Sequence, residues 1–342
     1  MTPPQSPGAG PAASATHTAE GLRKFRFGAG GEGNKDEGGA RKFVALAQTA
    51  EEYGYDTFAV PDHLGNQVGP LAALGALSQA TSRIRLATSV LANGFRHPAI
   101  LAKEATTIDV LSKGRLELGI GSGWMKEEFD KAGLEFGTPG ERIRRLDEAL
   151  TILDRLMRGE TLDFVGEFYQ INGLEGTPRP RQGPRPPIAV GGGGPKMLAL
   201  AAKHADIISV ATGTTKEGKL RLSDMTIEKT VERVDRIREA AGDRFDQIEL
   251  NWTIATIVVT DDREATADMA LKALAQGYPP NIAQDVELTV EDILSSPYLA
   301  FGSFEEIAEQ IREVRRRTTM SYIGVFPTQM DAFAPVIPLL RE

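Results

Sequence analysis

The sequence Lys113-Gly114-Arg115-Leu116-Glu117-Leu118-Gly119-Ile120-Gly121-Ser122-Gly123-Trp124 joins the end of an apolar helical pattern to a short apolar segment. Gly114 stands where a helix C-cap is expected. Residues 115–120 then predict a strand. The glycines that follow carry no Cβ, so a ligand can approach their backbone closely. The stretch therefore predicts a strand with a binding site at its carboxyl end.

Outward from this stretch, strand patterns alternate with helical patterns along most of the chain. The predicted strands cover residues 25–29, 57–60, 84–91, 115–120, 188–190, 207–210, 248–260 and 322–326. Eight strands at βα spacing favour an α/β fold, a (β/α)8 TIM barrel, over an open doubly wound sheet. We expect one barrel domain over residues 23–342, with insertions at the C-terminal face of the strands. Residues 1–22 are rich in Pro, Ala and Gly and predict a disordered tail.

Polar or glycine residues follow four of the predicted strands. They are Asp62-His63, Thr88-Ser89-Val90, Gly121-Ser122-Gly123, and Gly191 to Gly194. The active site of a (β/α)8 barrel lies at the carboxyl ends of its strands. The sequence therefore predicts that these four segments come together in one site.

The composition excludes several classes of site. The chain has 47 acidic and 39 basic residues, a net charge of −8, which argues against a general nucleic-acid binder. It has no cysteine, which excludes disulfides, cysteine-ligated metals and thiol nucleophiles, and its four histidines make a His-rich metal site improbable. We find no secretory signal and no apolar run long enough to span a membrane. The simplest expected location is the cytoplasm.

Two glycine-rich motifs resemble phosphate-binding sites, and the second is the stronger candidate. Gly28-x-Gly30-x-x-Gly33 matches a dinucleotide fingerprint, but six more polar or glycine residues separate it from the next helix, so we reject that interpretation. Gly191 to Gly194, followed by Pro195 and Lys196, places free N–H groups at a helix N-terminus and favours an anion. The alternative is a plain flexible turn. If a phosphate binds there, valine at Gly192 and Gly193 should lower affinity with little effect on apo stability.

His63 follows a strand directly and is preceded by Asp62. A histidine can carry a proton near neutral pH, so His63 is a candidate general acid. The alternative is a capping or packing histidine. Trp124 is the aromatic residue that the sequence places beside the predicted site.

These segments resemble the luciferase-like flavin and deazaflavin family, and within it the actinobacterial coenzyme F420-dependent branch. The matching pieces are Pro61-Asp62-His63, Thr88-Ser89-Val90-Leu91, Phe95-Arg96-His97-Pro98-Ala99, residues 114–124, and residues 187–194. The resemblance is good over residues 25–210 and is otherwise limited to the barrel plan. The string from Gly114 to Trp124 is the most specific part of it.

The resemblance implies a (β/α)8 barrel, often a homodimer, with a flat tricyclic cofactor over the third and fourth strand ends. It implies a cis peptide bond at Ser89–Val90 that backs the ring, the Asp62-His63 pair near the ring edge, and the cofactor phosphate on the glycine run after the fifth strand. The cofactor-binding residues that it implies are Asp62, His63, Ser89, Val90, Gly121, Ser122, Gly123, Gly191, Gly192, Gly193, Gly194, Lys196 and Met197.

The sequence departs from the sugar-phosphate dehydrogenases of this family. They have a carboxylate where this chain has Trp124, and a tryptophan where it has residues 65–67, Gly-Asn-Gln. We therefore expect an F420H2-dependent reductase of a C=C or C=N bond in a small-molecule or modified-peptide substrate. His63 would be the catalytic acid, and Asp62 would orient its imidazole or touch the edge of the cofactor ring. The alternatives are an FMN-dependent monooxygenase and a non-enzymatic cofactor-binding barrel. Residues 211–225 and 262–302 are expected to form the substrate lid.

Overall fold

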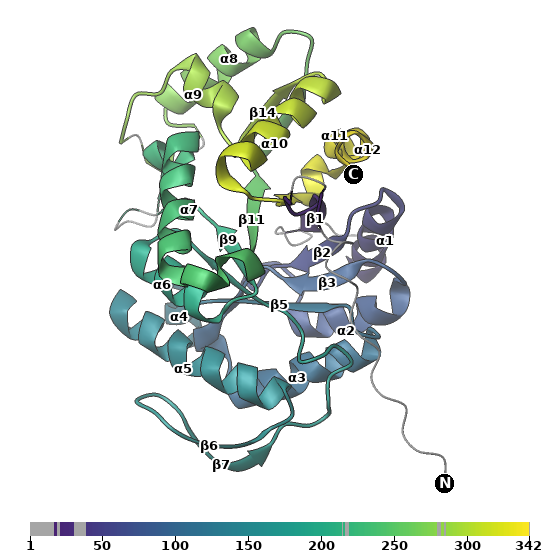
Figure 1. Ribbon diagram of the computed structural model, residues 1–342, viewed down its shortest axis with the longest axis vertical. Coiled ribbons are helices and arrows are strands. Elements are labelled where there is room, and N and C mark those ends of the chain that lie inside the picture. Colours follow the sequence, from purple (N-terminus) through teal and green to yellow (C-terminus); the bar gives the residue numbers. More distant parts are fainter. Residues whose placement is uncertain are drawn as a thin grey trace.

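The computed structural model describes residues 17–18, 21–30, 39–213, 215, 219–278, 282–283 and 285–341. Within these residues, parallel strands close into a barrel that is surrounded by helices (Figure 1). The order around the barrel is β1 (Arg26–Gly30), β2 (Thr57–Val60), β3 (Arg85–Thr88), β5 (Leu116–Gly121), β8 (Ile188–Gly192), β9 (Ile207–Val210), β11 (Glu249–Ile254) and β15 (Tyr322–Val325). Strand β15 pairs with β1 and β3 pairs with β5, which closes the ring. The predicted (β/α)8 barrel is confirmed.

Amphipathic helices pack on the outside of the barrel. They are α1 (Gly39–Glu52), α2 (Pro70–Ala80), α3 (Pro98–Leu111), α5 (Pro139–Met157), α6 (Pro195–His204), α7 (Ile227–Ala241) and α10 (Phe304–Thr318), followed by the short α11 (Met330–Phe333) and α12 (Ile337–Leu340). Gly114 follows α3 with φ +86°, and its N–H donates to the Asp109 carbonyl at 2.8 Å. The hydrogen bonds are those of a Schellman motif, in which Lys113, with φ +60°, takes the left-handed position after the C-cap Ser112. Gly114 therefore lies two residues beyond the C-cap, whereas the sequence predicted it at the C-cap.

Two predicted strands are interrupted. The segment 84–91 divides into β3 and the short β4 (Leu91–Ala92), with a cis peptide bond at Ser89–Val90 between them. The segment 248–260 divides into β11 and β12 (Thr256–Val259), and β12 pairs with β14 (Leu299–Gly302) instead of a barrel strand. The apolar character of each segment is continuous and therefore predicted a single strand. Such a pattern indicates extended backbone, but it does not show where a strand changes its pairing partner.

The two excursions from the barrel have structure of their own. Residues 161–175 form an antiparallel hairpin of β6 (Thr161–Val165) and β7 (Gln170–Glu175). The insertion at 262–302 contains α8 (Arg263–Ala275), β13 (Ile282–Ala283), α9 (Val290–Ser295) and β14, apart from residues 279–281 and 284, which lie outside the described residues. Helices α8 and α9 stand at the end of the molecule opposite this hairpin (Figure 1).

The insertion is joined to the loop after β9. Strand β10 (Leu220–Arg221) from that loop pairs with β13, and both segments contribute to a second apolar core. Its buried members are Leu222, Met225, Ala267, Leu274, Ile293, Tyr298, Leu299 and Phe301. Of the loop, residues 214 and 216–218 lie outside the described residues. The two predicted lid segments therefore pack as one unit.

The predicted N-terminal tail is described only in part. Residues 1–16, 19 and 20, and the third glycine of the rejected fingerprint, Gly33, lie outside the described residues. His17 forms a β-bridge with Arg23. None of the helices in the described part of the chain has the length and apolar character needed to cross a membrane.

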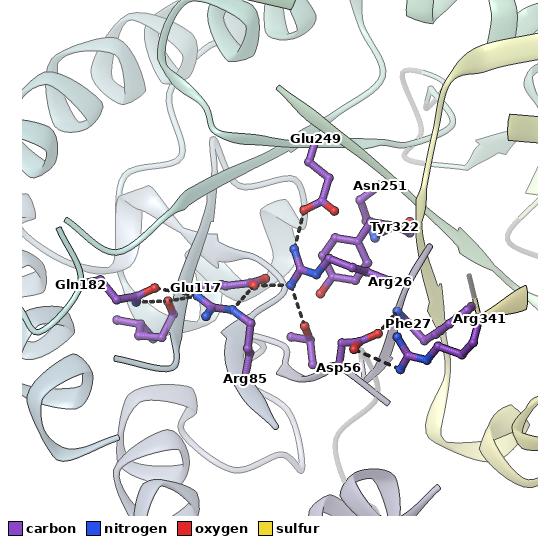
Figure 2. Close-up of polar contacts among 12 residues, drawn as sticks. Arg26, Phe27, Asp56, Arg85, Glu117, Gln182, Glu249, Asn251, Tyr322 and Arg341 are labelled. Atoms are coloured by element: carbon purple, nitrogen blue, oxygen red, sulfur yellow. Dashed lines mark hydrogen bonds and ion pairs between the residues drawn. The ribbon is translucent and has the colours of Figure 1, made fainter. Parts of the chain in front are cut away.

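Charged side chains fill the barrel where its strands begin (Figure 2). Arg26, at the start of β1, donates to Glu117 of β5 and to Glu249 of β11. Arg85 of β3 donates to the same oxygen of Glu117. The Arg26 guanidinium also lies 4.4 Å from the ring centre of Tyr322 in β15. We call these five residues the base network.

The two carboxylates of the base network differ in their balance of charge. Burial alone would raise the pKa of Glu117, but Arg26 and Arg85 outweigh it and hold that pKa below its usual range. Burial raises the pKa of Glu249, and Arg26 offsets only part of the increase. Glu117 is therefore the carboxylate whose negative charge the base network stabilises most strongly.

Replacing Glu117 should destabilise the barrel more than replacing Glu249. Glu117→Gln leaves two partly buried guanidiniums without their shared carboxylate, and breaking a fully buried pair in this way costs about 3–5 kcal/mol, which is the upper bound here. Glu249→Gln should cost clearly less, because the charge of Glu249 is already disfavoured. Urea unfolding at neutral pH measures both values. The exposed pair of Arg144 and Glu167 supplies a control, since Glu167→Gln should change stability by about 0.5 kcal/mol or less.

The pH dependence has a definite sign. Because the folded-state pKa of Glu117 is lowered, its contribution to stability is present above the pKa of an unfolded glutamate, about 4.3, and is lost as pH falls through the folded pKa. Wild-type protein and Glu117→Gln should therefore converge in stability on acidification. A constant difference down to acid pH would show that the charge of Glu117 does not carry the effect.

Candidate functional site

A cavity of about 890 Å³ lies at the carboxyl ends of β5, β8, β9 and β11. It brings together three of the four predicted strand-end segments. The predicted residues that line it are Ser89, Val90, Gly121, Ser122, Gly123, Gly191, Gly192, Gly193, Gly194 and Met197. Asp62, His63 and Lys196 are not among its lining residues. Asp62 and His63 lie beside it, after β2, and Lys196 is exposed.

The Ser89–Val90 bulge forms one wall of this cavity. Its peptide bond is cis, as the family resemblance implies. The Thr88 hydroxyl donates to the Gly119 carbonyl at 2.7 Å and accepts the Gly119 N–H at 2.9 Å. A Cβ at Gly119 would collide with the Thr88 carbonyl oxygen, and one at Gly121 would lie 3.0 Å from the Val90 Cγ2. Both glycines thus allow the close approach of residues 88–90 to β5, and Gly121 also lines the cavity.

The glycine run Gly191 to Gly194 ends β8 and opens α6. Its four positions differ in their surroundings. A Cβ at Gly192 would collide with Met197 Cγ and one at Gly193 with the Ala211 carbonyl oxygen, whereas a Cβ at Gly194 would meet nothing within 4 Å. The expectation that valine at Gly192 and Gly193 leaves the apo protein undisturbed is therefore wrong.

The first turn of α6 presents backbone donors beside the glycine run. Gly194 is its N-cap residue and gives no side-chain cap, and Pro195 occupies the first helical position. Uncapped N–H groups and the helix dipole favour a negative charge there. Met197, whose N–H belongs to this turn, lines the cavity. The arrangement fits a phosphate group, as the sequence predicts.

Asp62 has a different partner from the one expected. Its buried carboxylate forms a bidentate ion pair with Arg96, at 2.5 and 2.6 Å, and accepts the Ala92 N–H at 2.9 Å. These contacts tie the end of β2 to the residues after β4. The structure therefore does not support the expectation that Asp62 orients the His63 imidazole.

Glu128 of α4 (Lys126–Ala132) holds His63 instead. The His63 Nδ1 lies 3.1 and 3.2 Å from the two carboxylate oxygens of Glu128, which also accepts the Leu64 N–H at 3.0 Å. The imidazole packs edge-on against Trp124, with ring centres 5.9 Å apart. With Nδ1 committed to Glu128, Nε2 is the ring atom left for a substrate.

Trp124 links the His63–Glu128 pair to the cavity. It lines the cavity, and 58% of its surface is exposed, which is unusual for a tryptophan. A large aromatic ring kept exposed at a cavity wall can pack against a flat ligand. The predicted placement of Trp124 beside the site is confirmed.

The cavity is positively charged although the protein as a whole is negative. Among its lining residues, Arg142, Arg221, Lys229, Arg233 and Arg236 are basic, and Asp224 and Glu232 are acidic. Two cations are paired within this set, Arg233 with Asp224 at 2.6 Å and Lys229 with Glu232 at 2.8 Å. Such a local excess of positive charge favours anionic ligands.

The sequence analysis did not identify three residues of this region as functional: Arg96, Glu128 and Arg142. Arg96 lies in the string shared with the family, and Glu128 stands one helical turn after Trp124. Nothing at either position in the sequence indicates that Arg96 pairs with Asp62 or that Glu128 pairs with His63. Their roles depend on side chains that meet across 34 and 65 residues of sequence.

The comparisons with known proteins agree with this architecture. The family model described as luciferase-like monooxygenase matches residues 24–321. An F420-dependent glucose-6-phosphate dehydrogenase of Microbacterium testaceum (strain StLB037) is 29% identical, over 81% of this chain and 80% of the relative. The coenzyme F420 dependent tetrahydromethanopterin reductase from Methanopyrus kandleri superposes with a TM-score of 0.72 at 19% identity, over 93% of this chain and 100% of that one.

A riboflavin lyase solved with modified FMN and riboflavin superposes equally well, with a TM-score of 0.72 at 17% identity, over 93% of this chain and 91% of that one. At such identities the two structures establish the fold alone. The family assignment comes from the model match, which spans most of the sequence. The chain belongs to the luciferase-like monooxygenase family.

Proposed function

We propose that this protein is a coenzyme F420-dependent oxidoreductase that reduces a C=C or C=N bond in a small-molecule or peptide substrate. The observation that carries the proposal is the single cavity that joins the Ser89–Val90 bulge to the glycine run and the uncapped N-terminus of α6. One part suits a flat ring and the other a phosphate. Relatives named as F420-dependent enzymes support this choice of cofactor.

Each part of the site has a role in such a reaction. When bound, the reduced deazaflavin supplies a hydride. Val90 and the bare backbone at Gly121 would back the ring, and the Gly191–Gly194 run with the first turn of α6 would hold the phosphate. Nε2 of His63 would hold the proton that completes the reduction, while Glu128 fixes the imidazole through Nδ1. Asp62 shapes this region through Arg96.

Sugar-phosphate oxidation, the activity named for the relatives, is not our proposal for this chain. The family resemblance places a carboxylate where this protein has Trp124, and a tryptophan where it has Gly65, Asn66 and Gln67. Trp124 cannot exchange a proton with a substrate hydroxyl, because the indole N–H only donates. The site therefore lacks an acid–base group at that place.

An FMN-dependent monooxygenase is the second candidate, since a protein of this fold has been solved with modified FMN. Titrating the purified protein with F420 and with FMN, followed by fluorescence, separates the two. We expect F420 to bind the more tightly. Tight FMN binding without any response to F420 would replace the first proposal by the second. Tight binding of either cofactor with no turnover of any substrate would favour a non-enzymatic binding protein.

A valine at Gly194 should weaken binding of the phosphate without disturbing the fold. Gly194 has extended backbone geometry, φ −82° and ψ 149°, which valine adopts before proline, and its Cβ would meet no atom within 4 Å. Cofactor affinity should fall by about tenfold or more, which corresponds to ~1.4 kcal/mol. Calorimetric titration and thermal melting measure the two effects.

Gly69 provides the matched control. It is the N-cap of α2, also precedes a proline, also has open space at its Cβ, and does not line the cavity. Gly69→Val should leave affinity unchanged. Equal loss in both variants, or none at Gly194, would mean that the glycine run is only a turn.

His63→Asn should lower turnover by about 10²–10⁴-fold at saturating cofactor, the usual worth of a general acid. Cofactor affinity should stay nearly intact, because the glycine run and the bulge hold most of the cofactor. Glu128→Ala should lower turnover in the same direction, since it frees the imidazole. Steady-state kinetics with a substrate found by screening supply the measurement. Full turnover of His63→Asn at saturating cofactor would end the proton-donor assignment.

A further inference from the structure

Arg142 is a partly buried cation without a counter-ion. It lies in the first turns of α5, where it lines the cavity. Its guanidinium stacks on the Phe136 ring at 3.8 Å and donates to the Gly137 carbonyl at 3.0 Å, while Nε is buried and has no hydrogen-bond partner. No carboxylate in the described part of the chain forms an ion pair with it. Burial without such a partner lowers the pKa of Arg142.

The other arginines of α5 and its C-cap are all paired. Arg144 pairs with Glu167, Arg145 with Glu135, Arg155 with Glu160, and Arg158 with Asp154. Arg142 differs from them in facing the cavity. An arginine keeps its charge in proteins, and the Gly137 carbonyl and the Phe136 ring offset only part of the desolvation of Arg142, so a ligand with a negative group would supply the missing counter-charge.

We propose that Arg142 binds an oxyanion, a phosphate or a carboxylate, of the ligand that occupies this cavity. Its flat guanidinium, held in place by Phe136, is suited to two parallel hydrogen bonds to such a group. The inference rests on the proposed function for the identity of the ligands. It adds an arginine of α5 to a site that already has backbone N–H groups of α6 and the basic side chains Arg221, Lys229, Arg233 and Arg236.

Two sources of the oxyanion fit the geometry. One is the cofactor phosphate, because Arg142 and Gly194 line the same cavity and α5 packs on α6. The other is a carboxylate of the substrate, because Arg142 lines the same cavity as Trp124, and its apolar neighbours on α5, Pro139 and Ile143, line it too. An unsaturated acid could place its flat part against Trp124 and its carboxylate on Arg142.

The first arm of the test compares F420 with its phosphate-free ribityl deazaflavin. Affinities for both are measured in wild-type protein and in Arg142→Gln. If the cofactor phosphate is the anion, the preference of wild type for F420 over the ribityl deazaflavin should fall about tenfold in the variant. If the protein binds FMN instead of F420, then FMN and riboflavin take the places of this pair, so failure of the cofactor assignment does not remove the test.

The second arm compares cinnamate with cinnamamide, two flat unsaturated molecules that differ in charge. Binding is followed through tryptophan fluorescence, in cofactor-loaded protein or in apo protein if no cofactor binds. If the substrate carries the anion, wild type should prefer cinnamate and Arg142→Gln should lose that preference.

Arg144→Gln is the matched control, because it removes the same charge from the same helix at an exposed position. It should change neither preference. Arg142→Lys keeps the positive charge but lacks the planar guanidinium, so it should retain part of the preference. It replaces Arg142→Gln in both arms if that variant does not fold. Loss of either preference in the Arg142 variants alone supports the proposal. Preferences within twofold of wild type in both arms would overturn it.

Discussion

The guanidinium of Arg26 joins carboxylates from two strands that are not neighbours in the barrel, Glu117 of β5 and Glu249 of β11. Arg85 completes the charge balance at Glu117. Buried charges are stable only when they are paired and hydrogen-bonded, so these contacts link β1, β3, β5 and β11 at the base of the barrel. Paired charges fill the barrel at the end where the strands begin, and the cavity lies at the other end.

The open end is shaped by backbone contacts instead of large side chains. Thr88 is bound to Gly119 in both directions, and Val90 occupies the space that a side chain at Gly121 would need. These contacts place β5 against the bulge. The glycines of the sequence therefore serve two purposes: they let neighbouring strands approach, and they leave backbone facing the cavity. The insertion packs with the loop after β9 around an apolar core of its own, and Leu220 and Arg221 of that loop line the cavity.

Charge is distributed unequally between the cavity and the rest of the protein. The chain carries a net charge of −8, but the cavity wall has five basic and two acidic side chains. Most acidic side chains close to the site are already engaged, Asp62 by Arg96, Glu128 by His63 and Asp224 by Arg233. Arg142, among the cavity's cations, combines burial with the lack of any such partner. The site is thus prepared for ligands that carry negative charge.

The sequence by itself determined the barrel, the end of the barrel at which the site lies, and the segments that line it. These features follow from hydrophobic periodicity and from glycines at strand ends, and both can be recognised within a short stretch of sequence. Only the tertiary structure decided the pairing of side chains. Asp62 faces Arg96 and His63 faces Glu128, while Arg142 forms no ion pair with a carboxylate among the described residues, because those relations depend on how α4, α5 and the residues after β4 pack on the barrel. The split of 248–260 into two strands has the same origin, since a strand pattern specifies extended backbone but not its partner.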